Sequence, residues 1–423
     1  MIMSQQVVKN KFSNTILYLF AFSIMFFTYK DIISPLYGYM NFDWNPNSFK
    51  FVESIFLIII ISVLLPTKVN RPSDFLIHLL FLFPILPMIV LYGAENNSRE
   101  FLYSVVLGFT VVQILRNIKL SPLRIAKIYA PTFSKFLLII SWSTILIILA
   151  LGGTRYFNLN IFDVYEYRTL ASKNLPSIFL YILPVISKVA LPSSLLISIH
   201  YKNKFLACLA ILGSVIIFGL TSNKGPLFFP LITLAVYFII GRESPIKWLI
   251  VFYILTLILS HISFFIAGLE MFGSMIVRRS YLIPAELNYL YFEFFSSPEN
   301  NFFYWSDSRI TAGLYESPND FSGPRLIGME YFRENSNANT GMFGSGYMQA
   351  GYVGMMIYVI ILSFIFMMVD SYSKVMDTRL IVPLVLLTTL TSMISSDMLV
   401  SLLTHGLIYC VIILTLIQPY KPK

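Results

Sequence analysis

The feature that most constrains this chain is a series of apolar blocks, each close to the length of a bilayer crossing, which recurs from residue 13 to residue 417. A crossing helix needs roughly 20 apolar residues, and 57% of the chain is hydrophobic whereas only 12% is charged. A soluble fold cannot bury so large an apolar fraction. Blocks of this length also argue against the short alternating strands of a membrane barrel. The sequence therefore predicts an all-α, polytopic membrane helical bundle.

We expect about twelve transmembrane helices, which places both termini on one side of the membrane. The first block has a basic flank at Lys9 and Lys11 but no small-residue cleavage site, which favours a retained helix over a signal peptide. The expected spans are residues 13–30, 51–66, 75–92, 101–115, 136–152, 177–199, 205–221, 225–241, 248–267, 347–369, 380–396 and 399–417.

The distribution of charge orients the bundle. If the N-terminus is cytoplasmic, the inner segments hold 17 of the 30 basic residues, and 17 of the 21 acidic residues lie outside or near the outer surface. Five of the basic residues left outside lie in one long loop, where charge has little effect on orientation. The net charge of +9 is therefore a consequence of topology, and no nucleic-acid partner is expected.

The expected spans and their orientation divide the chain into three parts. Residues 1–267 carry nine helices with short connections and a small outer loop at 153–176, residues 268–346 form one long outer loop, and residues 347–423 carry the last three helices. Long loops are disproportionately functional or disordered, and the aromatic and charged composition of this one is not that of a disordered segment. We expect it to carry short helices and to fold over the outer mouth of the bundle.

The long loop contains the strongest candidate site, Arg278 with Arg279. Guanidinium groups match phosphate oxygens bidentately, although the pair could instead flank a span and reach lipid headgroups. The helix expected from Pro284 would then place Glu286, Tyr289 and Glu293 on one face. That helix either lines a site with two carboxylates or anchors the loop at the membrane interface.

Two lysines within residues 1–267 are further candidates for a binding site. Lys224 follows Asn223 in a tight outer turn between short spans, a pattern that can mark a polar cavity, but a solvated turn lysine explains it equally well. Lys188 lies within an expected span, where a charge is costly unless it faces protein or water. It could pair structurally with an acid such as Asp397.

The segment from Asn337 to Gly354 leads into the tenth span. Asn339, Thr340 and Ser345 precede or cap this helix, whose exposed amides would favour an anion. Glycine or alanine recurs every fourth residue at Gly346, Ala350 and Gly354, which predicts close packing of helix backbones.

Metal and cofactor chemistry has little support in the sequence. Cys208 and Cys410 both lie in apolar segments, and the lone intramembrane histidines His261 and His405 are more typical of hydrogen-bonded packing. No cluster has metal-ligand spacing and no nucleotide phosphate loop is present. We therefore expect no metal and no cofactor.

The chain resembles the Wzy-type O-antigen polymerases, the oligosaccharide repeat-unit polymerases of bacterial surface polysaccharide synthesis. The resemblance extends over nearly the whole chain in topology. It depends on residues 71–74 (RPSD), 222–224 (SNK), Arg278-Arg279 leading into 288–295 (NYLYFEFF), and 337–341 (NANTG) with 346–354.

This resemblance implies a GT-C-like, metal-independent glycosyltransferase of the inner membrane whose site faces the periplasm. It implies undecaprenyl-diphosphate-linked oligosaccharides as donor and acceptor, membrane lipids as surroundings, and a chain-length co-polymerase and a flippase as partners. Some members show arginine-to-glycine spacings in outer loops. Arg333 with Gly344 and Arg325 with Gly341 have such spacings, whereas Arg155 and Arg168 of the first outer loop do not reproduce them.

The residues divide into expected roles. Arg278, Arg279 and Lys224 would stabilise the charge that develops on the departing diphosphate, and Glu286 or Glu293 would act as the base for the acceptor hydroxyl. Tyr289, Tyr291 and Trp305 could stack on sugars, although interfacial belts explain aromatic residues equally well. The remaining substrate-binding candidates are Asn223, Arg155, Lys188, Arg325, Arg333, Asn339 and Thr340.

Two other functions fit the same pattern. An O-antigen ligase, which transfers finished glycan to lipid A-core, also has many helices and one large periplasmic loop. A lipid-linked oligosaccharide flippase or other transporter commonly has about twelve spans, but the crowding of charge on one face argues against the gates that alternating access needs on both sides.

Overall fold

The protein is all-helical in a computed structural model that describes residues 2–123, 125, 127–161, 164–308, 311, 316–332 and 336–418. These residues form no strand, and their only β-type pairing is an isolated bridge between Ile128 and Ile417. Each of the twelve expected apolar segments is helical over most of its length, although the last, 399–417, is interrupted at residues 404–406. Within the described part, eight helices are long and apolar enough to cross a membrane and two apolar helices are shorter. The helical membrane character is therefore confirmed, and the number of crossings stays a prediction.

The chain divides into two compact units that are both discontinuous in sequence. Unit 1 comprises residues 1–118, 243–367 and 392–399, and unit 2 comprises residues 119–242, 368–391 and 400–423. The long segment 268–346 therefore belongs wholly to unit 1. The segment 153–176, which the sequence predicts to be a small outer loop, belongs to unit 2.

Unit 1 is built around a buried central helix. The helical run from Pro72 to Ala94 is almost entirely buried. In contrast, only a third of the residues in the most apolar stretch of α13 are buried. The helix α1 packs against α13 and α3, and α3 packs against α5. The outward side of α13 presents Phe252, Leu259 and Phe265, which is typical of a lipid-facing helix. The elements of unit 1 are α1 (Ile2–Thr28), η1 (Tyr29–Ile33), α2 (Ser34–Tyr37), η2 (Gly38–Met40), α3 (Ser48–Leu64), α4 (Pro72–Leu80), η3 (Phe81–Ile85), α5 (Leu86–Ala94), α6 (Arg99–Leu115), α13 (Pro245–Ala267), α14 (Glu270–Phe272), η6 (Gly273–Leu282), α15 (Ile283–Ser296), α16 (Gly323–Tyr331) and most of α17 (Met342–Tyr372).

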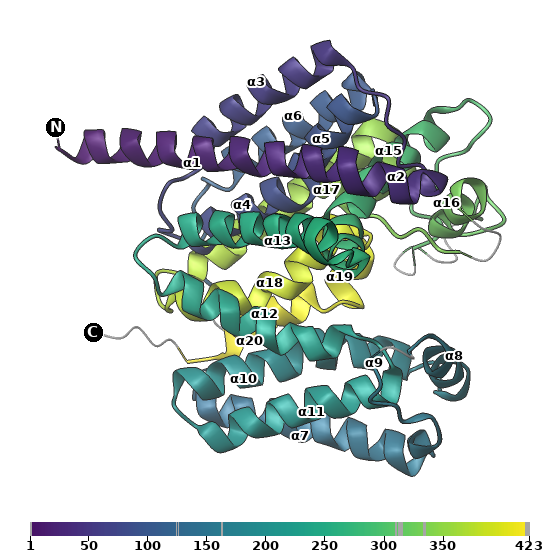
Figure 1. Ribbon diagram of the computed structural model, residues 1–423. Coiled ribbons are helices and arrows are strands. Elements are labelled where there is room, and N and C mark those ends of the chain that lie inside the picture. The colour runs from purple at the N-terminus through teal and green to yellow at the C-terminus, as the bar shows by residue number, and fades with distance from the viewer. Residues whose placement is uncertain are drawn as a thin grey trace. The chain divides into compact units, whose positions relative to one another are not determined.

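Unit 2 has α10 at its centre, in contact with α7, α11 and α12. Figure 1 shows α7, α10 and α11 running side by side. Its elements are α7 (Ala130–Ala150), η4 (Gly153–Tyr156), α8 (Tyr165–Asn174), α9 (Phe179–Val185), η5 (Ile186–Ala190), α10 (Leu191–His200), α11 (Lys204–Thr221), α12 (Gly225–Ile240) and α20 (Leu407–Leu416), while α18 (Thr378–Ile394) and α19 (Met398–Leu403) contribute to both units.

Four of the described elements are π-helical, and each ends two residues before a proline. In each case the residue before the proline donates its N–H to the carbonyl five residues earlier, as Leu191 does to Ile186 and Ile283 does to Arg278. Proline lacks an N–H and its ring clashes with the carbonyl four residues back, so a wider turn relieves the clash. The π-helical elements are η1, η3, η5 and η6, and the prolines are Pro35, Pro87, Pro192 and Pro284.

The described part of the long segment 268–346 carries helices, as its composition predicts. Its first part is a continuous helical run from Glu270 to Ser296, so Pro284 does not begin a separate helix as the sequence suggested. Figure 1 shows α2, α15 and α16 together at the end of unit 1 opposite the N-terminus. A hydrogen bond of 3.0 Å from Asn41 Nδ2 to the Tyr331 carbonyl ties the end of α16 to the residues that follow η2.

The small residues of α17 pack closely, but against each other. Ala350 and Gly351 leave helical geometry, and Gly351 has a φ of +58° that favours glycine. The chain turns back there, so that a Cβ placed on Gly354 would lie 2.2 Å from the Gly346 carbonyl oxygen. The predicted close packing is confirmed, with the second half of the same segment as the partner.

Gly354→Ala should lower the thermal unfolding midpoint of the detergent-solubilised protein, because its new methyl group meets backbone that cannot rotate away. Overpacking of this kind costs about 1–3 kcal/mol. The matched control is Gly241→Ala, whose new Cβ would have no neighbour closer than 3.5 Å. Equal midpoints for the two variants would show that the halves of α17 do not touch.

Candidate functional site

Unit 1 contains a cavity of about 630 Å³ that brings together distant parts of the sequence. Arg278 and Arg279 come from η6, Asn339 comes from the extended segment before α17, and Tyr39 comes from η2. The remaining lining residues are Met40, Ile283, Leu287, Phe332, Ser336, Asn337, Ala338 and Ser395. These side chains include two cations and several hydrogen-bond donors but no carboxylate, so the cavity suits an anion.

Arg278 is held in place by neutral neighbours. Its side chain is buried, its guanidinium lies 4.1 Å from the centre of the Tyr37 ring, and Nη2 donates a hydrogen bond of 2.8 Å to Ser274 Oγ. Nη1 lies 3.3 Å from Met40 Sδ, and the buried Nε has no hydrogen-bond partner among the described residues. Burial lowers the pKa of Arg278 from its ordinary value, yet a guanidinium stays protonated in proteins.

Arg279 and Asn339 complete the polar wall. Both side chains are exposed, and both line the cavity. Cationic and amide donors from two segments thus face one space. The sequence singled out Arg278, Arg279 and Asn339 separately and did not predict that they would line the same cavity. Thr340 and Ser345 lie elsewhere: both are buried, and Ser345 Oγ donates a hydrogen bond of 2.9 Å to the Gly341 carbonyl.

A carboxyl pair that the sequence did not reveal lies in the same unit. Glu286 of α15 and Glu95, just beyond α5, share a side-chain hydrogen bond, and Tyr29 and Asn97 also donate to Glu95. Burial raises the pKa of Glu95 to about 7. Burial and the neighbouring Glu95 raise the pKa of Glu286 well above its ordinary value. Near neutral pH, Glu286 therefore holds the shared proton and donates it toward Glu95.

The predicted face of α15 is only partly formed. Glu286 and Tyr289 are buried, whereas Glu293 is exposed, so the two glutamates do not present a common pair of carboxylates to solvent. The reason is that α15 packs against α5, to which Tyr289 donates its hydrogen bond, so this side of the helix faces the core of unit 1. None of these three residues lines the cavity.

The aromatic candidates hold backbone in place. Tyr289 donates a hydrogen bond of 3.0 Å to the Met88 carbonyl, and Tyr291 donates one of 2.8 Å to the Ala338 carbonyl. Both rings are buried, so neither offers a face for sugar stacking in this structure. Trp305 Nε1 donates to the Tyr358 hydroxyl at 3.0 Å. The hydrogen bond from Tyr291 to the Ala338 carbonyl fixes the segment that carries Asn339.

The other candidates lie in different places. Arg325 is in α16, with its guanidinium 5.2 Å from the Phe321 ring centre, and Arg333 lies outside the described residues. In unit 2, Arg155 is exposed in η4, and Lys224 stands just before α12, next to the exposed Asn223. Because Lys224 and the arginine pair belong to different units, their joint role stays a prediction.

Lys188 and Asp397 have separate contacts. Lys188 Nζ lies 3.2 Å from Thr391 Oγ1 and 3.1 Å from His405 Nδ1, whereas Asp397 accepts a hydrogen bond of 2.5 Å from the Tyr358 hydroxyl. Lys188 and Asn223 line a second cavity, which belongs to unit 2. Among the described residues, no group of three or more His, Cys, Asp or Glu side chains could hold a metal ion.

Tyr37, Tyr39, Met40, Ser395 and Glu95 are parts of the site that sequence reasoning missed. Glu95 directly follows an apolar block and resembles a solvated turn residue in the sequence. Tyr37 and Tyr39 follow the first span and resemble an interfacial belt. Only their contacts in the fold distinguish them. No family model, no curated protein and no solved structure matches the chain.

The carboxyl pair should make stability fall as pH rises. Between about pH 4.5 and about pH 7, the folded state binds more protons than the unfolded state. The contribution of the pair to the free energy of unfolding is therefore complete below about pH 4.5 and is lost as pH rises through the folded pKa of Glu95. Glu286→Gln keeps a neutral donor next to Glu95 and removes one raised pKa, so its unfolding midpoint should fall less over this range.

The measurement is thermal unfolding in detergent at a series of pH values, with Glu293→Gln as the control on the same helix. A shift of one pKa unit corresponds to about 1.4 kcal/mol, which is large enough to resolve. Identical pH profiles for wild type and Glu286→Gln would contradict a shared proton.

Proposed function

We propose that this chain is a membrane glycosyltransferase that polymerises undecaprenyl-diphosphate-linked oligosaccharide repeat units into O-antigen or a related surface polysaccharide. The reaction would take place on the periplasmic face of the inner membrane, with both termini in the cytoplasm and without a metal or other cofactor. The observation that carries the proposal is the cavity of unit 1, where Arg278, Arg279 and Asn339 converge from two distant segments.

The chemistry of the cavity fits a departing diphosphate. When a bond between a sugar and a lipid diphosphate breaks, negative charge develops on the leaving oxygen, and cations fixed beforehand stabilise it without reorganisation. Arg278 is held by Tyr37 and Ser274 before any ligand arrives. Arg279 supplies a second guanidinium from the adjacent position of the helix. Paired guanidinium groups bind the oxygens of a diphosphate more specifically than point charges do.

The acceptor hydroxyl must lose a proton as it attacks the anomeric carbon. A base works best when its pKa lies near the working pH, and the pKa of Glu95 is raised to about 7 by burial. We assign this proton to the Glu95–Glu286 pair. Ile283 and Leu287, on either side of Glu286 in α15, line the cavity, so the helix that carries Glu286 also forms part of the cavity wall.

Arg279→Ala should lower the rate of chain growth by roughly 10² to 10³ fold, because one preorganised charge is removed from the leaving group. The assay uses purified protein and synthetic lipid-diphosphate repeat units, without nucleotide or an ion gradient, and resolves products by length. Arg242→Ala, which removes an exposed arginine of unit 2, is the control and should retain full activity.

The products also separate this proposal from its rivals. Ordered polymer from repeat units alone supports the polymerase, whereas transfer only to added lipid A-core would identify a ligase. Movement of lipid-linked sugar across vesicles without any new glycosidic bond would identify a transporter. Full-length polymer from Arg279→Ala at the wild-type rate would remove the arginine from the reaction.

A further inference from the structure

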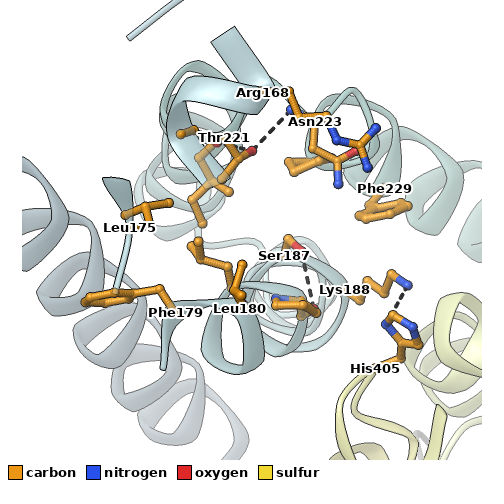
Figure 2. Close-up of a pocket in the computed structure, with 15 residues that line it drawn as sticks. Arg168, Leu175, Phe179, Leu180, Ser187, Lys188, Thr221, Asn223, Phe229 and His405 are labelled. Carbon is orange, nitrogen blue, oxygen red and sulfur yellow. Dashed lines mark hydrogen bonds between the residues drawn. The ribbon is translucent and has the colours of Figure 1, made fainter. Parts of the chain in front are cut away.

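Unit 2 contains its own cavity, of about 290 Å³, whose walls differ in chemistry. Figure 2 shows Leu175, Phe179 and Leu180 on one side and Lys188 with His405 on the other. The apolar side continues into a buried cluster of the same unit that includes Leu183. The cavity is therefore amphipathic and has a cation on its polar side.

Among the residues that the structure describes, Lys188 has no counter-ion. It lies in η5, near the middle of the 22-residue candidate span Phe179–His200, and the ion pairs among the described residues include none to it. Its ammonium has three donors and no acceptor. His405 Nδ1 and Thr391 Oγ1 therefore accept two hydrogen bonds, which leaves one donor. A charge this deep in an apolar span is costly unless a partner compensates it.

The rest of the polar side points to an anion as that partner. Arg168 of α8 and Asn223, after α11, also line the cavity, and Figure 2 shows both at the top of the opening, with Phe229 between them and Lys188. Two cations and an amide thus border one small space. A ligand that reaches Lys188 must satisfy these donors and also lie against the apolar wall.

We infer that this cavity binds the phosphate end of a single-chain lipid that carries no sugar, either a monophosphate or a diphosphate. The phosphate would lie between Lys188 and Arg168, and the chain would lie along Leu175, Phe179 and Leu180. Pockets that bury a drug-sized ligand begin at about 300 Å³, so this one accommodates a headgroup and the start of a chain but not an oligosaccharide. The inference goes beyond the proposed reaction, because it concerns binding by unit 2 whether or not the chain transfers sugars.

The test is photo-crosslinking with a diazirine-bearing farnesyl monophosphate, followed by mapping of the labelled peptides by mass spectrometry. In the full-length protein, we expect labelling of the 168–188 region. Farnesyl diphosphate should compete for it, whereas farnesol and inorganic phosphate at the same concentration should not. Competition by inorganic phosphate alone would mean a simple anion site, and competition by farnesol would mean a lipid-tail groove. Either result would overturn the inference.

Lys188→Met is the decisive variant, because it keeps the length of the side chain and removes the charge. Charge-assisted hydrogen bonds contribute enough that labelling should require at least about tenfold more probe. The control Lys173→Met removes an exposed lysine from α8 and should label like wild type. Unchanged labelling of Lys188→Met would also overturn the inference.

Two further measurements keep the result interpretable. Without ligand, Lys188→Met should unfold at the wild-type temperature or higher, because methionine suits an apolar span, but it should lose the stabilisation that farnesyl phosphate gives to the wild type. Arg279→Ala should retain labelling of the 168–188 region. Labelling that maps only to unit 1, or that Arg279→Ala abolishes, would assign lipid phosphate to the cavity of the proposed function instead.

Discussion

An ionisable side chain in this molecule is stable only where the helices supply it with partners, because an apolar interior surrounded by lipid offers neither water nor a counter-ion. One buried ion pair meets this condition directly. Arg116 donates to Asp74 at 2.8 Å and to Ser73 at 2.9 Å. The half-buried Glu53 also has its partners in place, since it accepts from Tyr92 at 2.6 Å and from the exposed Arg99 at 3.0 Å. Removing one partner from such a pair leaves an uncompensated charge, so these groups are best explained as structural.

Arg278 and Lys188 meet the same condition in a different way. Among the described residues, Arg278 contacts an aromatic ring, a hydroxyl and a thioether, and Lys188 contacts a hydroxyl and an imidazole. All of these partners are neutral, and each cation borders a cavity. A cation whose donors are held in place, and which has no anionic partner among the described residues, is prepared to bind an anion. This contrast, more than the abundance of positive charge, distinguishes the two cavities from the rest of the bundle.

Hydropathy was sufficient to place the helices, because every expected apolar block is helical and helix bounds differ by a few residues at most ends. Motif reasoning also singled out Arg278, Arg279 and Asn339 one segment at a time as phosphate-binding candidates, but it grouped the arginine pair with Lys224 and did not indicate that Asn339 lines the same cavity. It could not anticipate the Glu95–Glu286 pair, because the 190 residues between them leave no local signal. Nor could it detect that Tyr289 and Tyr291 face inward, because an amphipathic pattern does not reveal which polar edge a neighbouring helix covers.

The prolines indicate where the π-helical turns lie, which hydropathy and motifs do not reveal. Each π-helical element ends at the residue two before a proline, and the missing proline N–H would otherwise have bonded to the carbonyl four residues earlier. In η5 that carbonyl belongs to Lys188, and in η6 it belongs to Ser280, directly after Arg278 and Arg279. π-Helical turns often occur at functional sites. Here one local solution, a widened turn ahead of a proline, positions the cations of both cavities. Pro87 follows η3, whose residues are all apolar. The widened turn therefore comes from the proline, and a charged residue is not needed to form it.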